Sequence, residues 1–161
     1  MIRSVHINDA KALLEIYNYY VLHSVATFDN QPLSLQVFID KLTQINAEYP
    51  FLVFEYENEI LGYAYGSKFR PKPAYKNTVE TTVYVKQNAH GKQIGSKLYA
   101  KLLKQLKAQS FHMALGVLTL PNEASVKLHN KFNFTQVAYL KEVGFKFGKW
   151  LDVGIFELKL N

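Results

Sequence analysis

The sequence predicts a mixed α/β fold whose strands and helices follow the order βααβββαβαββ. Four segments carry apolar residues at helical spacing, and seven shorter segments are rich in β-branched and aromatic residues. With 48% hydrophobic residues among 161, the chain has enough apolar side chains to build a sizeable core. One predicted helix connects the strands at 78–86 and 112–120, so we expect these two strands to be parallel, whereas short connections elsewhere predict antiparallel hairpins.

The first half of the chain is predicted to hold three strands and two helices. A short strand at 2–5 leads to a helix that Asn8 is expected to cap, and Ser34 is expected to cap the second helix. Strands at 51–56 and 60–65 are separated by three residues, which predicts a hairpin. The helical apolar positions are Leu13, Leu14, Tyr17, Tyr20 and Val21 in the first helix and Val37, Phe38, Leu42 and Ile45 in the second.

The second half begins with a loop, because Pro71 and Pro73 fall within 68–76. A helix expected at 91–107 is amphipathic, with leucines on one side and lysines on another. Asn133 is expected to end the last helix in a left-handed conformation, which asparagine tolerates. The remaining elements are predicted as strands at 78–86, 112–120, 134–140 and 151–160 and a helix at 122–132.

Composition narrows the class of protein. The chain has no cysteine, which excludes a disulfide framework, a thiolate metal site and a cysteine nucleophile. No run approaches the ~18 apolar residues of a membrane span, and the first ten residues lack the apolar core of a signal peptide. We therefore expect one soluble, cytoplasmic domain over residues 1–161 with no membrane partner.

The net charge of +6 is concentrated in one stretch. No acidic residue lies between Glu80 and Glu123, and the stretch predicts a surface that binds something anionic. A nucleic-acid-binding helix is the alternative, but the stretch has no arginine and no recognised motif, and an exposed lysine face is usually only solubilising. We therefore expect no nucleic-acid partner. The basic residues of the stretch are Lys86, Lys92, Lys97, Lys101, Lys104 and Lys107.

A glycine-containing loop between the strand at 78–86 and the following helix is the first candidate site. Such a loop presents unpaired backbone N–H groups and the positive end of the helix dipole, which suits phosphate. Gly91 and Gly95 permit close approach of the backbone, and Lys92 adds charge. The spacing matches neither the Walker loop nor the dinucleotide fingerprint, and a plain helix start with two glycines is the alternative.

The segment His90-Gly91-Lys92-Gln93-Ile94-Gly95 resembles the coenzyme A pyrophosphate loop of the GNAT acetyltransferase superfamily, Arg/Gln-x-x-Gly-x-Gly/Ala. His90 stands where that pattern has Arg or Gln, and Gln93 where it has its first glycine. Further segments resemble the phosphinothricin acetyltransferase group, whose members acetylate the amino group of small amino-acid analogues such as phosphinothricin and methionine sulfoximine or sulfone. These segments are Ile16–Asn18, Ala26–Phe28, Pro73–Tyr75, Thr78–Glu80, Val83–Val85, Pro121–Ser125, Leu128–His129, Val143–Gly144, Lys146–Gly148 and Trp150–Asp152.

The resemblance implies a GNAT fold, with a mostly antiparallel sheet whose central parallel strands splay apart, and acetyl-CoA as co-substrate without a metal. It implies that the strand backbone at Val83, Tyr84 and Val85 pairs with the pantetheine arm, although Val-Tyr-Val is also simply a good strand sequence. It also implies that the phosphates contact the loop, and that the chain forms a homodimer. The remaining cofactor candidates are His90, Gly91, Lys92, Gln93, Ile94, Gly95, Ser96, Asn122 and Lys131.

Two residues are candidates for proton transfer. Glu80 would act as general base, since an ammonium must lose a proton before its nitrogen can attack a thioester; a solvent-facing strand glutamate is the alternative. By resemblance, His129 would protonate the departing thiolate, and a packed helix histidine, with water as the acid, is the alternative. Asn122 follows a proline and would cap the last helix.

The loop at 69–75 is the candidate for binding the acceptor. The sequence has two arginines, and one of them, Arg70, offers bidentate pairing to a carboxylate or phosphinate, with Lys72 adding charge. A solvated basic loop is the alternative, and an acceptor of another kind, a peptide amine or a different metabolite, stays open. His6, His23 and His112 show no metal-ligand spacing. Further candidate acceptor contacts are Phe28, Tyr75, Thr81, Thr82 and Trp150.

Overall fold

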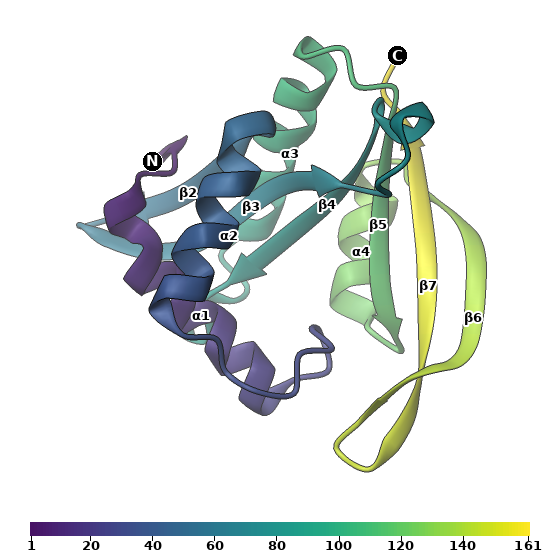
Figure 1. Ribbon diagram of the computed structural model, residues 1–161, viewed down its shortest axis with the longest axis horizontal. Helices are drawn as coiled ribbons and strands as arrows, with labels where there is room; N and C mark the ends of the chain where they lie inside the picture. The colour runs from purple at the N-terminus through teal and green to yellow at the C-terminus, as the bar shows by residue number, and fades with distance from the viewer.

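A computed structural model describes residues 1–161 and contains a seven-stranded sheet in the order β1-β2-β3-β4-β5-β7-β6 (Figure 1). The chain order of strands and helices agrees with the sequence prediction, and three short 3-10 turns are added to it. Every neighbouring pair of strands is antiparallel except β4 and β5, which are parallel as predicted. The strands are β1 (Ile2–Ser4), β2 (Phe51–Tyr56), β3 (Glu59–Lys68), β4 (Thr78–Val85), β5 (Met113–Leu120), β6 (Thr135–Lys146) and β7 (Lys149–Lys159).

Helices cover both faces of the sheet. In Figure 1, α1 (Ala10–His23) and α2 (Leu35–Glu48) lie in front of the strands, and α3 (Ile94–Ala108) and α4 (Glu123–Lys131) lie behind them. Each face therefore has its own core. The buried cluster on the α1–α2 side includes Leu13, Phe38 and Tyr63, and the cluster on the α3 side includes Leu98, Leu102 and Phe156.

The parallel strands β4 and β5 separate soon after they meet. They are paired at three positions only, from Thr78 with Met113 to Glu80 with Leu115. Beyond that point each strand continues for five residues, β4 to Val85 and β5 to Leu120, without pairing to the other. Figure 1 shows the two strands diverging downward. This splay is the opening that the family resemblance implies.

The local sequence explains most boundaries, and two predictions were wrong. Asn8 does not cap α1, because it lies inside a 3-10 turn (Ile7–Asp9), and the Asp9 carboxylate accepts the His6 N–H at 2.7 Å and pairs with Arg3. The third helix begins at Ile94 rather than at Gly91. Ser34 and Asn133 behave as predicted: Ser34 Oγ accepts the Val37 N–H, and Asn133 has a φ of +62°.

The last two strands are longer than predicted. The strands expected at 134–140 and 151–160 form one hairpin from Thr135 to Lys159, closed by Phe147 and Gly148 with φ values of +52° and +71°. An irregularity between Leu140 and Gly144, where Glu142 has a φ of +55°, interrupts the alternating pattern that a strand prediction relies on.

Candidate active site

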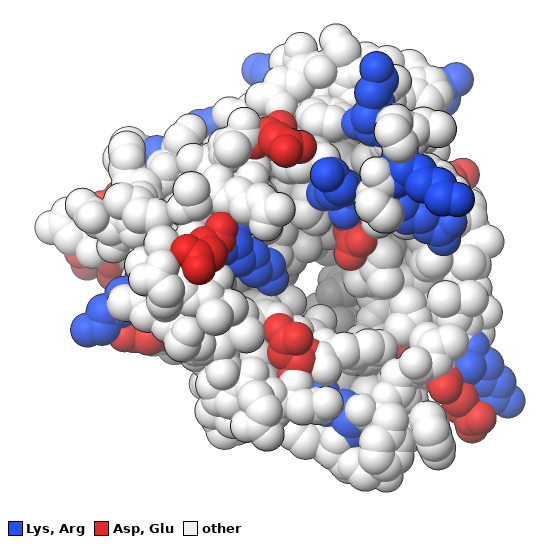
Figure 2. Space-filling model, in the orientation of Figure 1, with Lys and Arg blue, Asp and Glu red and all other residues white.

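The splay between β4 and β5 is the candidate active site. Glu80 lies opposite Leu115 at the last paired position, at the closed end of the opening. The edges of β4 and β5 that face each other beyond this point lack strand partners, so their backbone groups remain available to a ligand. Figure 2 shows a hollow between the two strands on this face, with acidic side chains at its rim and basic side chains gathered above it and to its right.

Alternate residues of β4 face opposite sides of the sheet. The Tyr84 ring packs against Tyr17 and Tyr20 of α1, with ring centroids 5.6 and 5.1 Å apart. Thr81 faces the other side, where its Oγ1 lies 2.6 Å from the hydroxyl of Tyr99 in α3. Because side chains alternate along a strand, Glu80 shares the α1 side with Tyr84.

Glu80 has the environment that the sequence prediction required of a base. Its side chain is half-buried, and burial raises the pKa of its carboxyl above the ordinary value because ionisation is disfavoured away from water. No cation contributes to this pKa shift. A carboxylate held in this way accepts a proton more readily than a solvated one.

The loop from Lys86 to Gln93 leads from β4 into α3 and leaves the helix start open. A 3-10 turn (Gln87–Ala89) is followed by Gly91 with a φ of +79° and Gln93 with a φ of +59°. Gln93, the residue that departs from the family pattern, thus adopts the left-handed conformation that glycine adopts freely. No side chain caps α3, so the N–H groups of its first turn are free for an anion. Gly95 and Ser96 belong to that turn.

The side chains of Tyr20 and His90 contact the backbone at the end of β4. The Tyr20 hydroxyl donates to the Val85 carbonyl at 2.5 Å and lies 2.8 Å from His90 Nε2, which is itself 3.1 Å from the same carbonyl. His90 therefore fixes the end of the strand as well as lining the loop. Val83 and Val85 pack toward the α3 side. The Val85 carbonyl is already bonded, and the backbone of Tyr84 faces Tyr63 of β3, so Val83 has the freest backbone toward the splay.

The basic stretch does not form one surface. The Lys86 ammonium pairs with Glu59, Lys101 donates to the Ile2 carbonyl at 2.8 Å, and Lys97 lies 6.0 Å from the centre of the Phe54 ring. These three lysines therefore face β1, β2 and the β2–β3 turn. Lys92 is exposed in the loop itself.

His129 lies on the α3 side, buried beneath β5. It is 3% exposed, its Nδ1 is 2.7 Å from the Ser125 carbonyl, and its Nε2 is 3.0 Å from the Tyr99 hydroxyl. Its ring sits so close to Gly116 that a Cβ added there would lie 2.2 Å from Nε2. Burial lowers the pKa of this imidazole, while the hydrogen bond to the carbonyl opposes that shift. The side chain thus has very little contact with solvent.

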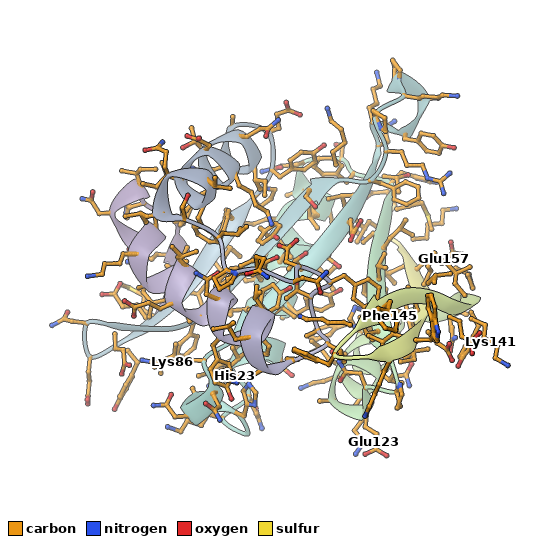
Figure 3. All side chains as sticks on the ribbon, turned by 60° about the horizontal axis from the view of Figure 1, so that its bottom comes forward. His23, Lys86, Glu123, Lys141, Phe145 and Glu157 are labelled. Carbon is orange, nitrogen blue, oxygen red and sulfur yellow. The ribbon has the colours of Figure 1, made fainter.

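The two remaining cofactor candidates lie on α4. Asn122 caps the helix as predicted, because its Oδ1 accepts the Ser125 N–H at 3.1 Å. Lys131 is exposed in the last turn. Figure 3 shows Lys86, directly after β4, and Glu123, at the start of α4, on opposite sides of the splay.

The β3–β4 loop is internally ordered. The Arg70 guanidinium lies 4.7 Å from the centre of the Phe69 ring and 5.4 Å from that of Tyr75, and it donates to the Tyr75 hydroxyl at 3.3 Å. Lys72 is exposed at the start of the 3-10 turn (Pro73–Tyr75). Two residues separate Tyr75 from Thr78, the first residue of β4, so the loop that carries Arg70 and Lys72 lies next to the paired end of β4 and β5.

The other predicted acceptor contacts are scattered. Phe28 packs on the hairpin, where a Cβ at Gly144 would lie 2.4 Å from its ring. Thr82 is half-buried on the Glu80 side of β4, whereas the Thr81 side chain faces α3 on the other side of the sheet. Trp150 is 65% exposed near the tip of the hairpin, against Phe145, and does not line the splay.

Sequence reasoning missed a set of residues that hold the loop between α1 and α2. Lys146 is 3% exposed, and its ammonium donates to the carbonyls of Ser24 and Thr27, each at 2.8 Å. Thr119 Oγ1 donates to the Val25 carbonyl at 2.7 Å. Three loop carbonyls are thereby tied to β5 and β6. A lysine in an alternating strand gives no signal of this role, because the carbonyls lie more than a hundred residues away.

Two further observations describe the molecule as a whole. No helix is both long and apolar enough to cross a membrane. No group of three or more histidine, aspartate or glutamate side chains is placed to hold a metal ion.

The residues present fit a long ligand that ends in phosphates. The free strand edges of the splay offer backbone hydrogen bonds, the uncapped start of α3 offers N–H groups to an anion, and Glu80 stands at the closed end. An extended amide-bearing arm with a pyrophosphate at one end and a thioester at the other matches this arrangement. The fold and site thus define the class of acyl-CoA-dependent acyltransferases.

Comparison with known proteins gives the family. Residues 2–155 match the model described as the acetyltransferase (GNAT) domain, and the chain belongs to this family. It is 42% identical over 156 residues to a phosphinothricin N-acetyltransferase of Streptomyces coelicolor, covering 94% of this chain and 91% of the relative. It is 34% identical to an L-methionine sulfoximine/L-methionine sulfone acetyltransferase of Pseudomonas aeruginosa, covering 99% and 94%.

A solved structure supports the same assignment. The crystal structure of a GNAT superfamily phosphinothricin acetyltransferase from Sinorhizobium meliloti in complex with AcCoA superposes with a TM-score of 0.97 at 31% identity, covering 100% of this chain and 88% of that one. The protein is therefore an acetyl-CoA-dependent N-acetyltransferase.

Proposed function

We propose that the protein transfers acetyl from acetyl-CoA to the amino group of a small amino acid or analogue of the phosphinothricin and methionine sulfoximine or sulfone type. The observation that carries this proposal is the position of Glu80, a half-buried carboxylate at the closed end of the splay. The named activities of the relatives at 42% and 34% identity support the choice of acceptor.

The transfer is direct and takes place in a ternary complex. Glu80, whose raised pKa makes it a better proton acceptor, takes a proton from the acceptor ammonium directly or through water. Acetyl-CoA supplies the thioester, and its pantetheine arm pairs with the free edge of β4 at Val83. A strand N–H stabilises the oxyanion that forms when the amine attacks. Much of the acceleration comes from holding the two substrates together.

The two proton-transfer candidates lie on opposite faces of the sheet. Glu80 faces the α1 side, and His129 lies on the α3 side. The acceptor amine therefore approaches from the α1 side, while the leaving thiolate receives its proton from the α3 side or from water. The splay is the place where both faces can act on one molecule, because the sheet is closed on either side of it.

Recognition of the acceptor uses the loop at 69–75. Arg70 presents a guanidinium that is already oriented by two aromatic rings, and Lys72 adds a second positive charge. A guanidinium pairs well with a carboxylate or phosphinate, so an acceptor with an anionic head beside its α-amine fits this loop.

A substrate panel with acetyl-CoA tests the proposal. We expect acetylation of methionine sulfone, methionine sulfoximine or phosphinothricin and no acetylation of a peptide carrying a free N-terminal amine. The release of free CoA thiol measures the reaction in each case. Activity on the peptide alone would replace the proposed acceptor class with the peptide alternative. Thermal unfolding with CoA is the companion measurement, since a ligand of the folded state must raise the melting temperature.

Two further features belong to this proposal. We propose that the enzyme acts in the cytoplasm, where acetyl-CoA is available to it.

We also propose a homodimer formed through the β6–β7 hairpin. β6 is an edge strand of the sheet, and the hairpin carries a set of side chains that are at least 40% exposed although large and apolar: Val137, Tyr139, Leu140, Val143, Phe145, Phe147 and Trp150. A second copy pairing with the same surface would cover them.

A further inference from the structure

A chain of four hydrogen bonds runs behind the closed end of the splay. It starts at the Ser125 carbonyl, 2.7 Å from His129 Nδ1, and continues from Nε2 to the Tyr99 hydroxyl at 3.0 Å. From there it passes to Thr81 Oγ1 at 2.6 Å and ends at the Leu115 carbonyl at 2.9 Å. Leu115 is the residue paired with Glu80, so the chain ends at the last paired position of the parallel strands.

Both ends of this chain are carbonyl oxygens, which can only accept hydrogen bonds. The four links therefore need four protons. The Thr81 and Tyr99 hydroxyls supply one each, and a neutral imidazole supplies one, which leaves one link without a proton. A doubly protonated His129 supplies the fourth. The chain thus has room for one proton more than its neutral groups carry.

The surroundings leave the proton no other nearby acceptor. Tyr99 is the titratable side chain in contact with His129, and it is fully buried. The other side chains packed on the imidazole are aromatic, Phe134 and Phe156, and β5 presents Gly116 without a side chain. No charged group contributes to the pKa shift of His129; burial lowers it, and the Ser125 carbonyl opposes that effect.

We propose that Thr81, Tyr99 and His129 form a buried relay that can take up one extra proton and exchange it with the splay at Thr81. The proposal rests on the proposed function in one respect, the use of that proton on the leaving thiolate. As the C–S bond breaks, the Thr81 hydroxyl gives its proton to the sulfur and takes the Tyr99 proton. Tyr99 takes the Nε2 proton of His129, which is left neutral. Thr81 is therefore the group that touches the sulfur, and Tyr99 is a positioning residue that links it to His129.

This relay accounts for two features that packing alone does not. His129 is only 3% exposed and its Nε2 faces the Tyr99 hydroxyl rather than the splay, whereas Thr81 reaches the backbone of β5 where the strands separate. Gly116 lets the imidazole come within contact of β5, because any side chain there would displace it.

The test is the protonation of His129 in the protein without substrate. Nitrogen-15 NMR of the ring nitrogens gives the pH at which both carry protons. In Thr81→Val two links remain for the two protons of a neutral imidazole and Tyr99, so the advantage of the extra proton disappears. We expect the midpoint to fall by about one pH unit, the effect of one hydrogen bond to a charged group. Thr81→Ser restores the hydroxyl and should restore the midpoint.

Tyr99→Phe should lower the midpoint in the same way, and Tyr49→Phe, the same deletion at the α2–β2 junction, should leave it unchanged. A Thr81→Val midpoint equal to that of wild type would overturn the relay.

A kinetic experiment tests the use of the proton. The kcat should fall in Thr81→Val and recover in Thr81→Ser, with KM for acetyl-CoA unchanged; equal kcat in all three proteins would overturn the use of the proton. Loss of the proposed function would look different, because no amine would be acetylated by wild type while the NMR midpoints still separated.

Discussion

At the scale of single residues, the proposed base Glu80 leads to one prediction about activity and one about stability. Replacing Glu80 by Gln keeps the shape of the side chain but removes the proton acceptor, so we expect kcat/KM at neutral pH to fall by about 10²- to 10⁴-fold. CoA should still raise the melting temperature, because the strand edges and the loop are intact. Initial rates with methionine sulfone and thermal unfolding with CoA measure the two effects.

The same substitution should stabilise the protein at pH values above the folded-state pKa of Glu80. The folded-state pKa of Glu80 lies above its unfolded value, so the folded state binds more protons across that window and stability falls as the pH rises through it. Glu80→Gln removes this loss. We expect equal melting temperatures near pH 4 and a higher one for the variant at pH 8. Glu48→Gln, at an exposed end of α2, is the control and should show no such difference. A lower melting temperature for Glu80→Gln at pH 8 would contradict the argument.

At the scale of elements, the α1–α2 loop depends on a lysine from the hairpin. Lys146→Met would leave the carbonyls of Ser24 and Thr27 buried without their donor, so we expect a loss of about 2 kcal/mol in unfolding free energy. The loop carries Phe28, so KM for the amine acceptor should rise several-fold while KM for acetyl-CoA stays the same. Lys149→Met, an exposed lysine in the same hairpin, is the control. Steady-state kinetics and urea unfolding check both effects; a rise in KM for acetyl-CoA alone would contradict the role of the loop.

Local patterns predicted which elements form, but not how distant segments meet. Apolar spacing placed all four helices and seven strands, because each burial pattern is a property of its own segment. Asn8 failed as a cap because Asp9, anchored by Arg3 of β1, competes for the same turn. Lys146, Tyr99 and Thr81 could not be placed, because their roles come from carbonyls and hydroxyls on other elements. The place of Glu80 on β4 was predictable from the sequence. Its position opposite Leu115 of β5 was not, because it depends on the register of the two strands.

At the scale of the whole molecule, the two faces of the sheet carry different groups of the proposed site. The α1 side carries the proposed base Glu80 and the α1–α2 loop, and the α3 side carries the uncapped helix start proposed to bind phosphate and the buried His129 chain. The splay joins the two sides because it interrupts the sheet at one place. Substitutions on one side should therefore affect mainly one substrate.

The exposed face of the β6–β7 hairpin makes a prediction about assembly. Phe145 and Trp150 pack on each other and are 55% and 65% exposed, which is costly for side chains of this size unless a partner covers them. We expect wild type to sediment as a dimer at micromolar concentration, and Phe145→Ser combined with Trp150→Ser to shift it to monomer. Tyr56→Ser, which removes a 58% exposed ring at the end of β2, should leave the dimer intact. A monomeric wild type at tens of micromolar would rule out this interface. Because Gly144 and Lys146 of the same hairpin hold the α1–α2 loop, the monomeric variant should also show a raised KM for the acceptor.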